Sequence, residues 1–411
     1  MSTAHVASPR PRHLWLVRPE ELIRPRARRD VAARRTVALL LGSTTFLTAV
    51  GLIMVLSASS VSAYAQFGDS FRYFQRQGAY AIVGVLALVL TSRMRYDAWR
   101  RLSLPLLVLT AIMLALVLHP AAGIEAYGSS RWFQMGPVTV QPSEVAKLSL
   151  VVFAAAMLAG RWRSLNDLGR LATPLLPVCI LVCGMVILQP DLGTTVILSG
   201  TIFLLLFAAG VRLRYLAVSG TIGAIVGMGL IMSADYRRIR FLSFLNPWED
   251  AGNTGYQLVQ SLIALGSGGF TGVGLGASRQ KWQYVPNAHT DFIFSILGEE
   301  LGLLGEIVVL VAFGALLFAG IRIAAQAKDV FGRLLAAGIV SWFGLQALVN
   351  LGAVTGLLPI TGVPLPFLSY GGSSLVVSLT AVGILMSIAR APAEVRTRAK
   401  GARARRRPRA P

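Results

Sequence analysis

The densest group of ionisable residues beside apolar sequence is YVPNAHTDFIFSILGEELGLLG, residues 284–305. It contains His289, Asp291, Glu299 and Glu300. Apolar surroundings disfavour the charged form of a carboxyl group, so the pKa of Asp291 should rise toward the range in which a carboxylate accepts a proton. Asp291 is therefore a candidate general base. The structural alternative is that Asp291 caps the helix that follows it.

Two further motifs place charges in apolar sequence. Glu144 and Lys147 in QPSEVAKL lie three residues apart, which puts them on one face of a helix. A lone charge at membrane depth is unfavourable, so we expect the two to pair, either as a structural salt bridge or as part of the lining of a polar cavity. Asp191 in QPDLG follows a proline and opens an apolar block, which predicts a helix N-cap.

Three arginines occur in DYRRIR, at Arg237, Arg238 and Arg240. Their segment is expected to face outward, where basic residues are normally scarce, so we expect them to bind an anion. Pyrophosphate suits the arginine fork, and salt bridges to nearby acids are the alternative. The glycine run at residues 264–276 lacks the strand–turn–helix context of a dinucleotide site. We expect it to allow close backbone approach to a ligand, or a re-entrant turn.

The segment GLLPITGVPLPFLSYGGSS, residues 356–374, is rich in proline and glycine. Its prolines prevent a regular helix, and irregular backbone at membrane depth is tolerated only where it is buried in protein or lines a cavity. Ser369 and Tyr370 would then present hydroxyl groups at the start of the next helix. They are candidate pocket residues, with a structural turn as the alternative.

The elements that must position these residues are membrane helices. Hydrophobic residues make up 55% of the 411 residues and charged residues only 14%, which is too little charge to cover a soluble domain. The sequence predicts an all-α membrane protein with about ten transmembrane helices, because the apolar residues fall in blocks long enough to cross a bilayer. The blocks are 37–56, 77–90, 102–118, 142–158, 171–188, 192–209, 215–232, 300–321, 333–351 and 372–388.

The net charge of +21 is distributed unevenly. Most of the 39 basic residues fall in alternate connections and in the two ends, as the positive-inside rule requires, and this pattern argues against nucleic acid as a partner. Both termini are therefore expected in the cytoplasm, with a large extracytoplasmic loop at 233–299 between the seventh and eighth spans. Within that loop, 254–265 has helical spacing and is expected to lie on the membrane interface.

The chain divides into a polytopic membrane domain, 36–390, and two basic tails, 1–35 and 391–411. The tails are rich in Arg, Pro and Ala and are expected to be disordered in the cytoplasm, setting topology or contacting anionic membrane lipids. Cys179 and Cys183 lie four apart in one span, where simple packing is the expected role. No internal repeat is visible, so the repeat signature of many transporters is missing.

Six motifs resemble the SEDS family of bacterial cell-wall proteins, in the same order and relative location. They are QPSEVAKL, QPDLGT, GYQLVQSLIALGSGG, GVGLG, NAHTDFIFSILGEELG and LLPITGVPLPFLSYGGSS. The resemblance covers nearly all of residues 37–390. LSASSVSAY and SRQKWQYVPNAHTDF look more like the division members of the family, FtsW, than like the elongation members, RodA.

The resemblance implies a peptidoglycan glycosyltransferase. Such proteins polymerise lipid II, an undecaprenyl-pyrophosphate disaccharide-pentapeptide, at the outer face of the cytoplasmic membrane and, in the division branch, at the septum. A class B penicillin-binding protein (a transpeptidase) and other divisome proteins are the implied partners. The family's essential acid matches Asp291, and its acid–base pair matches Glu144 and Lys147. Asp291 would act as general base on the acceptor hydroxyl in an inverting displacement, or would help to bind a divalent cation, Mg²⁺ or Mn²⁺; no organic cofactor is implied.

By position, Arg237, Arg238 and Arg240 would neutralise the leaving pyrophosphate. His289, Ser369 and Tyr370 would belong to the pocket. Three other functions remain open: a lipid II flippase, a RodA-like elongation polymerase and a non-catalytic scaffold for division proteins. A flippase needs a polar path to the cytoplasmic side, whereas the polar candidates here gather at the outer ends of the spans.

Overall fold

The computed structural model describes residues 26–119, 124–126, 129–135, 138–162, 168–282, 284–286 and 288–391. Its helices are α1 (Arg26–Phe67), α2 (Arg72–Arg93), α3 (Asp97–Val117), α4 (Pro142–Gly160), α5 (Leu168–Leu188), α6 (Leu192–Ala208), α7 (Leu213–Met232), α8 (Asp235–Leu245), α9 (Tyr256–Ser267), α10 (Ile293–Gln326), α11 (Val330–Val354) and α12 (Gly372–Arg390).

Ten of these helices coincide with the ten apolar blocks. Eight are long and apolar enough to cross a membrane, and two shorter apolar helices, Thr173–Leu188 and Leu192–Ala208, complete the set. The prediction of about ten spans is confirmed. Three boundaries differ most: α10 begins at Ile293 rather than near 300, α1 begins at Arg26, inside the segment assigned to the basic tail, and α1 ends at Phe67 rather than near 56. Residues 1–25 and 392–411 of the two tails lie outside the described residues.

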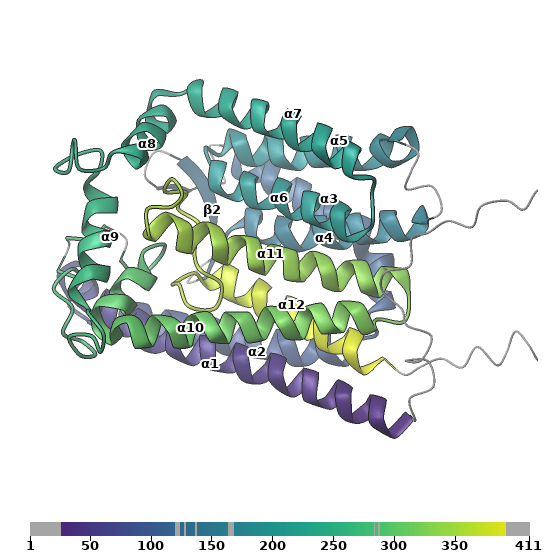
Figure 1. The fold of residues 1–411 in the computed structure, drawn as a ribbon, viewed down its shortest axis with the longest axis horizontal. Coiled ribbons are helices and arrows are strands. Elements are labelled where there is room, and N and C mark those ends of the chain that lie inside the picture. Colours follow the sequence, from purple (N-terminus) through teal and green to yellow (C-terminus); the bar gives the residue numbers. More distant parts are fainter. Residues whose placement is uncertain are drawn as a thin grey trace, which may run out of the picture.

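The spans run along the long axis of the molecule (Figure 1). The first helix, α1, begins at the same end at which the last helix, α12, finishes, as an even number of crossings requires. That end carries the α2–α3, α6–α7 and α10–α11 connections and is called the basic end below. The opposite end carries α8, α9 and a small sheet, and is called the loop end. Helix α9, which covers most of 254–265, crosses this end and packs against α10.

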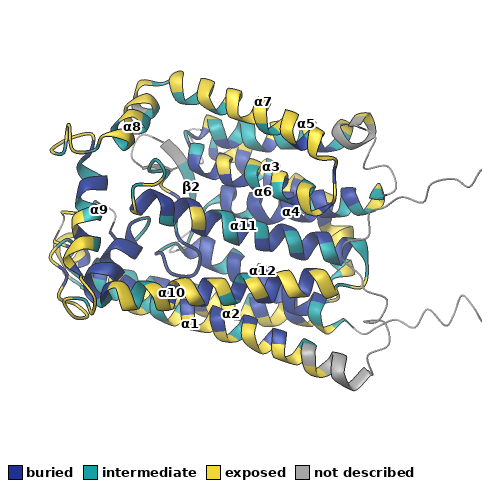
Figure 2. Cartoon of the chain, viewed as in Figure 1, coloured by how far each residue is buried: buried dark blue, intermediate teal, exposed yellow. Residues whose placement is uncertain are grey.

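The inner helices are α4, α11 and α12. Over their most apolar windows, 67%, 61% and 78% of the residues are buried, whereas the value for α7 is 6% (Figure 2). α12 packs most closely on α2, and α11 packs on α10, α4 and α6. The apolar surface of α7 is therefore left for lipid, and the polar side chains of α4 and α11 are kept away from it.

Two features of the loop end were not predicted. The α3–α4 connection forms a three-stranded antiparallel sheet of β1 (Ile124–Ala126), β2 (Ser129–Met135) and β3 (Val138–Val140). The arginine segment after α7 forms helix α8. Two of the strands have only three residues, and α8 has a basic surface, so neither gives the apolar periodicity that identified the spans.

Helix α10 is broken at Gly302, where φ is +66° and ψ is −169°. The glycine run enters this break. The N–H groups of Leu303 and Leu304 donate to the carbonyls of Gly269 (3.0 Å) and Phe270 (3.2 Å). A Cβ on Gly272 would lie 2.1 Å from the Glu300 carbonyl oxygen. The glycines thus permit close backbone approach, here to the chain's own broken helix.

Candidate active site at the loop end

Asp291 lies in the loop just before α10, and it does not cap that helix. The N-cap residue of α10 is Phe292, with no side-chain capping bond. One carboxylate oxygen of Asp291, Oδ1, accepts a hydrogen bond of 2.8 Å from the Thr290 hydroxyl. The other, Oδ2, faces Gly362, lying 3.9 Å from the place that a Cβ would occupy there. The Thr290 hydroxyl therefore engages Oδ1, while Oδ2 faces a residue without a side chain.

The surroundings of Asp291 perturb its acidity. Burial raises the pKa of this carboxyl above its usual value, while the Thr290 hydrogen bond, a backbone hydrogen bond within Asp291 and the positive charge of Arg240 act to lower it. Burial is the largest of these effects, so the net pKa shift is upward. A carboxylate with a raised pKa is a stronger base when ionised, which is the property that a general base needs.

The backbone of Asp291 is held by α11. The Asn350 side-chain amide donates to the Asp291 carbonyl and to the Val363 carbonyl, each over 2.8 Å. Asn350 is buried, at 2% exposure. One turn earlier, Gln346 donates to the Pro364 carbonyl over 2.7 Å. Two amides of α11 therefore support consecutive carbonyls of the proline-rich segment, and one of them also supports Asp291.

Glu144 and Lys147 pair on α4, as their spacing predicted. The Lys147 ammonium lies 2.8 Å from the Glu144 carboxylate, and both side chains are only 2% exposed. Lys147 also donates to the Gln346 side-chain oxygen over 2.9 Å and lies over the Trp342 ring at 5.4 Å. The pair is therefore joined through Gln346 to the proline-rich segment.

His289 and Tyr370 form an aromatic cluster with Tyr73. The His289 ring centroid lies 4.7 Å from that of Tyr73 and 5.5 Å from that of Tyr370. The Tyr370 N–H donates to the His289 carbonyl over 2.9 Å. Burial lowers the pKa of His289 to about 4, so this ring is neutral near pH 7. Burial also raises the pKa of Tyr370, which keeps its hydroxyl protonated.

Ser369 has mainly a structural position. Its hydroxyl accepts a bond of 2.8 Å from the Leu365 N–H and closes a turn. Gln77 of α2 then bridges this segment: its amide donates to the Ser369 carbonyl and accepts from the Gly371 N–H, both over 3.2 Å. Ser369 therefore has the role of a structural turn residue, which was the alternative to a pocket residue. Tyr370 instead belongs to the aromatic cluster.

The three arginines of α8 differ in their surroundings. Arg237 donates to the Leu230 carbonyl at the end of α7 over 3.1 Å, and so ties α8 to α7. Arg238 and Arg240 are exposed. Arg240 is the arginine whose charge acts on Asp291. Of the three arginines expected to bind an anion, Arg240 thus lies in the electrostatic reach of the candidate base, Arg237 has a structural contact, and Arg238 is exposed.

Glu299 and Glu300 are buried and serve to hold the loop before Asp291. Glu299 accepts from the Ser278 hydroxyl and from the Arg279 N–H. Glu300 accepts from the Ser57 hydroxyl over 2.6 Å and lies 3.7 Å from the Lys281 ammonium. These contacts account for both carboxylates without a catalytic role.

Three smaller expectations can be compared with the structure. Asp191 caps α6, accepting from the N–H (3.0 Å) and hydroxyl (2.8 Å) of Thr194. Cys179 and Cys183 are free thiols. Among the described residues, no group of three or more His, Cys, Asp or Glu side chains is arranged to hold a metal ion.

Comparisons with known proteins support the family suggested by the motifs. The FtsW, RodA and SpoVE family model, described as cell cycle protein, matches residues 37–394. A protein of Geobacter metallireducens named probable peptidoglycan glycosyltransferase FtsW is 45% identical, covering 83% of this chain and 91% of that protein. Stage V sporulation protein E of Bacillus subtilis is 44% identical, covering 84% and 95%.

Solved structures share the fold. A chain from a structure described as a peptidoglycan synthase complex that coordinates polymerization and crosslinking has a TM-score of 0.71 and 30% identity, over 85% of this chain and 96% of that one. Rod shape determining protein RodA of Thermus thermophilus gives a TM-score of 0.62 and 28% identity, over 85% and 95%. The chain belongs to the FtsW, RodA and SpoVE family of cell cycle proteins.

Proposed function

We propose that this multi-pass membrane protein is a peptidoglycan glycosyltransferase that polymerises lipid II during septal wall synthesis. The proposal is supported by the relatives named for this activity and by the position of Asp291 at the loop end. Because the basic connections lie at the opposite end, the positive-inside rule puts Asp291 at the outer face of the cytoplasmic membrane. Lipid II presents its sugars at that face.

Asp291 is the proposed general base. Its Oδ2 takes the proton of the acceptor sugar's 4-hydroxyl while that oxygen bonds to the anomeric carbon of the donor. The bond from this carbon to the lipid pyrophosphate breaks, and the pyrophosphate leaves with the electron pair. One such displacement converts an α-linked pyrophosphate into a β-glycosidic bond. The Thr290 hydroxyl keeps Oδ1 occupied, so Oδ2 is the oxygen assigned to the proton.

Arg240 is the proposed contact for the leaving pyrophosphate. It is exposed on α8, and its charge reaches Asp291. Guanidinium groups match phosphate oxygens in geometry and charge. A Mg²⁺ or Mn²⁺ ion would fit only with few protein ligands, because Asp291 is the carboxylate assigned to this site, and the remaining ligands would be pyrophosphate oxygens and water. Such an ion would supply charge stabilisation to the pyrophosphate.

A class B penicillin-binding protein is the proposed partner, along with other divisome proteins. The support is the likeness to a chain from a peptidoglycan synthase complex in which polymerization and crosslinking are coordinated. In such an assembly the glycan strand made at the loop end would be crosslinked on the same side of the membrane.

The observation that carries the proposal is the Asp291 carboxylate, which has a raised pKa and whose Oδ2 faces Gly362. The test is polymerisation of lipid II by the purified protein in liposomes with its transpeptidase partner. Asp291→Asn should lower the rate by roughly 10²- to 10⁴-fold, the usual contribution of a general base. Glu249→Gln, a neutralised carboxylate in an exposed part of the same loop, is the matched control and should polymerise normally. An Asp291→Asn protein with the wild-type rate would rule out the general base.

The same liposomes distinguish a lipid II flippase from a glycosyltransferase. A fluorescent lipid II analogue placed in one leaflet reports translocation, while glycan strands report polymerisation. Translocation without strand formation in the wild-type protein would replace the glycosyltransferase proposal with a transporter.

A further inference from the structure

The basic end holds an open cavity of about 410 Å³ at the turn between α2 and α3. Its lining is Arg95, Asp97, Ala98, Arg100 and Arg101. The site described above lies at the other end of the spans, so this cavity has no part in it. The cavity is large enough for a phosphate with a small polar group attached.

The charge in this cavity is only partly balanced. Arg95 and Asp97 form an ion pair of 3.4 Å, with side-chain exposures of 82% and 54%, and exposed pairs of this kind contribute little. Within the described part of the chain, Arg100 and Arg101 have no ion-pair partner. Both lie near the N-terminal end of α3, where the helix dipole is unfavourable for a cation and favourable for an anion. An anion in the cavity would pair with these arginines and would also interact favourably with the helix dipole.

The backbone around the cavity is held by hydrogen bonds that do not use the guanidinium groups of the lining arginines. The Met94 carbonyl accepts from the Ser387 hydroxyl of α12 over 2.6 Å. The Tyr96 hydroxyl donates to Asp329, before α11, over 2.6 Å, and Trp99 is buried at 8% exposure. The turn is thus tied to α12 and to the segment before α11. Setting topology requires only that arginines be present on this side, whereas here they surround a fixed cavity.

The membrane surface next to the cavity is apolar. α2 packs mainly on α12 and α1, whereas α3 packs mainly on α4. Each helix therefore has a face left for lipid: Leu86 and Leu90 on α2 are 64% and 63% exposed, and Leu104 and Val108 on α3 are 58% and 49% exposed. Leu90 and Leu104 lie about one turn from the arginine turn. A molecule with a phosphate head and hydrocarbon chains would satisfy both surfaces.

We propose that this cavity binds the headgroup of an anionic phospholipid from the leaflet at the basic end, with its acyl chains against α2 and α3. Arg100 and Arg101 bind the phosphate oxygens, and Arg95 exchanges its weak pair with Asp97 for the same anion. Basic pockets between membrane helices on the cytoplasmic side recognise lipid headgroups by this combination of charge and adjacent apolar surface.

Native mass spectrometry of the detergent-solubilised full chain, titrated with phosphatidylglycerol or with phosphatidylcholine of the same chains, tests the proposal. We expect phosphatidylglycerol to bind and phosphatidylcholine to bind far more weakly. The triple variant Arg95→Gln, Arg100→Gln, Arg101→Gln should bind phosphatidylglycerol roughly ten- to a hundredfold more weakly, since each arginine near the surface contributes to anionic-lipid affinity. The matched control removes the same charge elsewhere at the basic end: Arg212→Gln, Arg214→Gln, Arg322→Gln.

Equal loss in both triple variants, or loss in neither, would overturn the proposal. Because the pocket triple could fold poorly, Asp97→Asn gives a second test: it removes the competing carboxylate and should strengthen phosphatidylglycerol binding, so unchanged or weaker binding contradicts the site. Glycerol phosphate distinguishes the two sources of the anion. If it binds as tightly as phosphatidylglycerol, the apolar faces contribute nothing, and the lipid assignment is wrong.

Discussion

The side-chain amide of Asn350 donates one hydrogen bond to the Asp291 carbonyl and another to the Val363 carbonyl, each 2.8 Å long. It thereby joins the loop that carries the candidate base to the irregular segment that faces it. Gln346, one turn earlier, joins that segment to Lys147. The position of Asp291 consequently depends on α11, an inner helix of the bundle, rather than on the loop alone (Figure 2).

Asn350→Ala should lower the turnover number for lipid II polymerisation by roughly ten- to a hundredfold, with a small change in KM. Both carbonyls lose their donor, and a displacement of about 1 Å at a reacting group can reduce the rate by about 10². Initial rates over a range of lipid II concentrations separate the two parameters. Leu348→Ala, an exposed position on the same helix, is the control. If Asn350→Ala turns over like this control, Asn350 has no positioning role.

Arg240→Gln should move the acidic limb of the pH–rate profile to higher pH. The Arg240 charge lowers the pKa of Asp291 against the larger effect of burial, so its removal lets that pKa rise further. A general base must be ionised, so a higher pKa means that activity is lost earlier as the pH falls. The profile of kcat/KM for lipid II measures this directly.

Arg238→Gln provides the comparison, because Arg238 is an exposed arginine on the same helix. Its profile should keep the wild-type acidic limb. Two identical limbs for wild type and Arg240→Gln would show that Arg240 does not act on the base, whatever its effect on the maximal rate.

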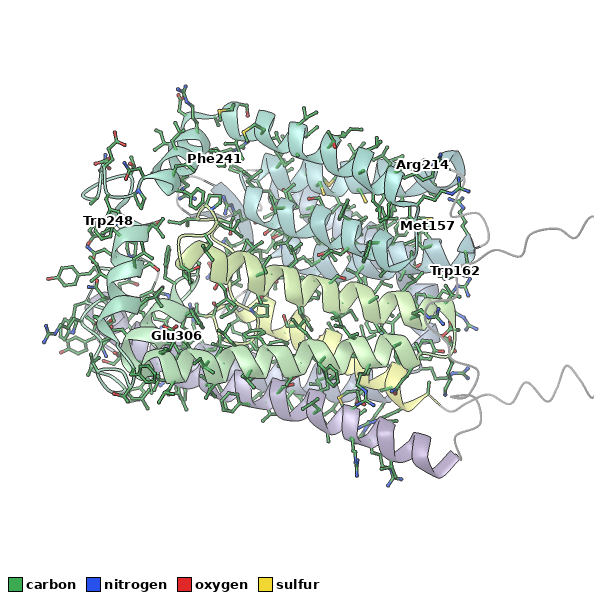
Figure 3. The ribbon with its side chains drawn as sticks, in the orientation of Figure 1. Met157, Trp162, Arg214, Phe241, Trp248 and Glu306 are labelled. Atoms are coloured by element: carbon green, nitrogen blue, oxygen red, sulfur yellow. The ribbon has the colours of Figure 1, made fainter. Side chains whose placement is uncertain are left out.

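The spans could be predicted because each is a long apolar block, and the membrane admits few alternatives to a helix there. The eighth span was placed too late because Glu299 and Glu300 interrupt the apolar sequence; they are buried by contacts with Ser278, Ser57 and Lys281, which no local pattern predicts. Glu306 is a third acidic residue in α10, and it lies just past the break in the helix (Figure 3). Its place in the first turn after Gly302 complements the dipole of the second half of the helix.

The candidate site was predictable where its residues are charged or follow a local spacing, as with Asp291, Glu144 and Lys147. Gln346 and Asn350 were missed because they are neutral and lie in an apolar helix. Their spacing could have identified them. Two side-chain amides four residues apart in one span share a helix face, and at membrane depth they need hydrogen-bond partners within the protein. The partner carbonyls, by contrast, come from the proline-rich segment and follow only from the tertiary structure.

Lys147→Met should destabilise the protein by about 3–5 kcal/mol, the usual effect of leaving one member of a buried ion pair without its partner. Glu144 would remain at 2% exposure with no counter-ion on α4. The double variant Glu144→Gln, Lys147→Met should recover much of this loss, because no uncompensated charge remains. Thermal unfolding in detergent compares the three proteins. Equal destabilisation of single and double variants would contradict an electrostatic role for the pair.

His289→Phe should make the protein less sensitive to mild acid. Burial lowers the pKa of His289 to about 4, below the ordinary value of 6.5. Between these two values the unfolded chain binds a proton that the folded chain does not, so folding stability falls as the pH decreases through this window. From pH 7 to pH 5 the loss amounts to roughly 2 kcal/mol. Phenylalanine keeps a ring beside Tyr73 and Tyr370 and does not titrate. Thermal midpoints at pH 8, 7, 6 and 5 should therefore diverge below pH 7, with wild type falling faster; parallel curves would mean that His289 is not held neutral by burial.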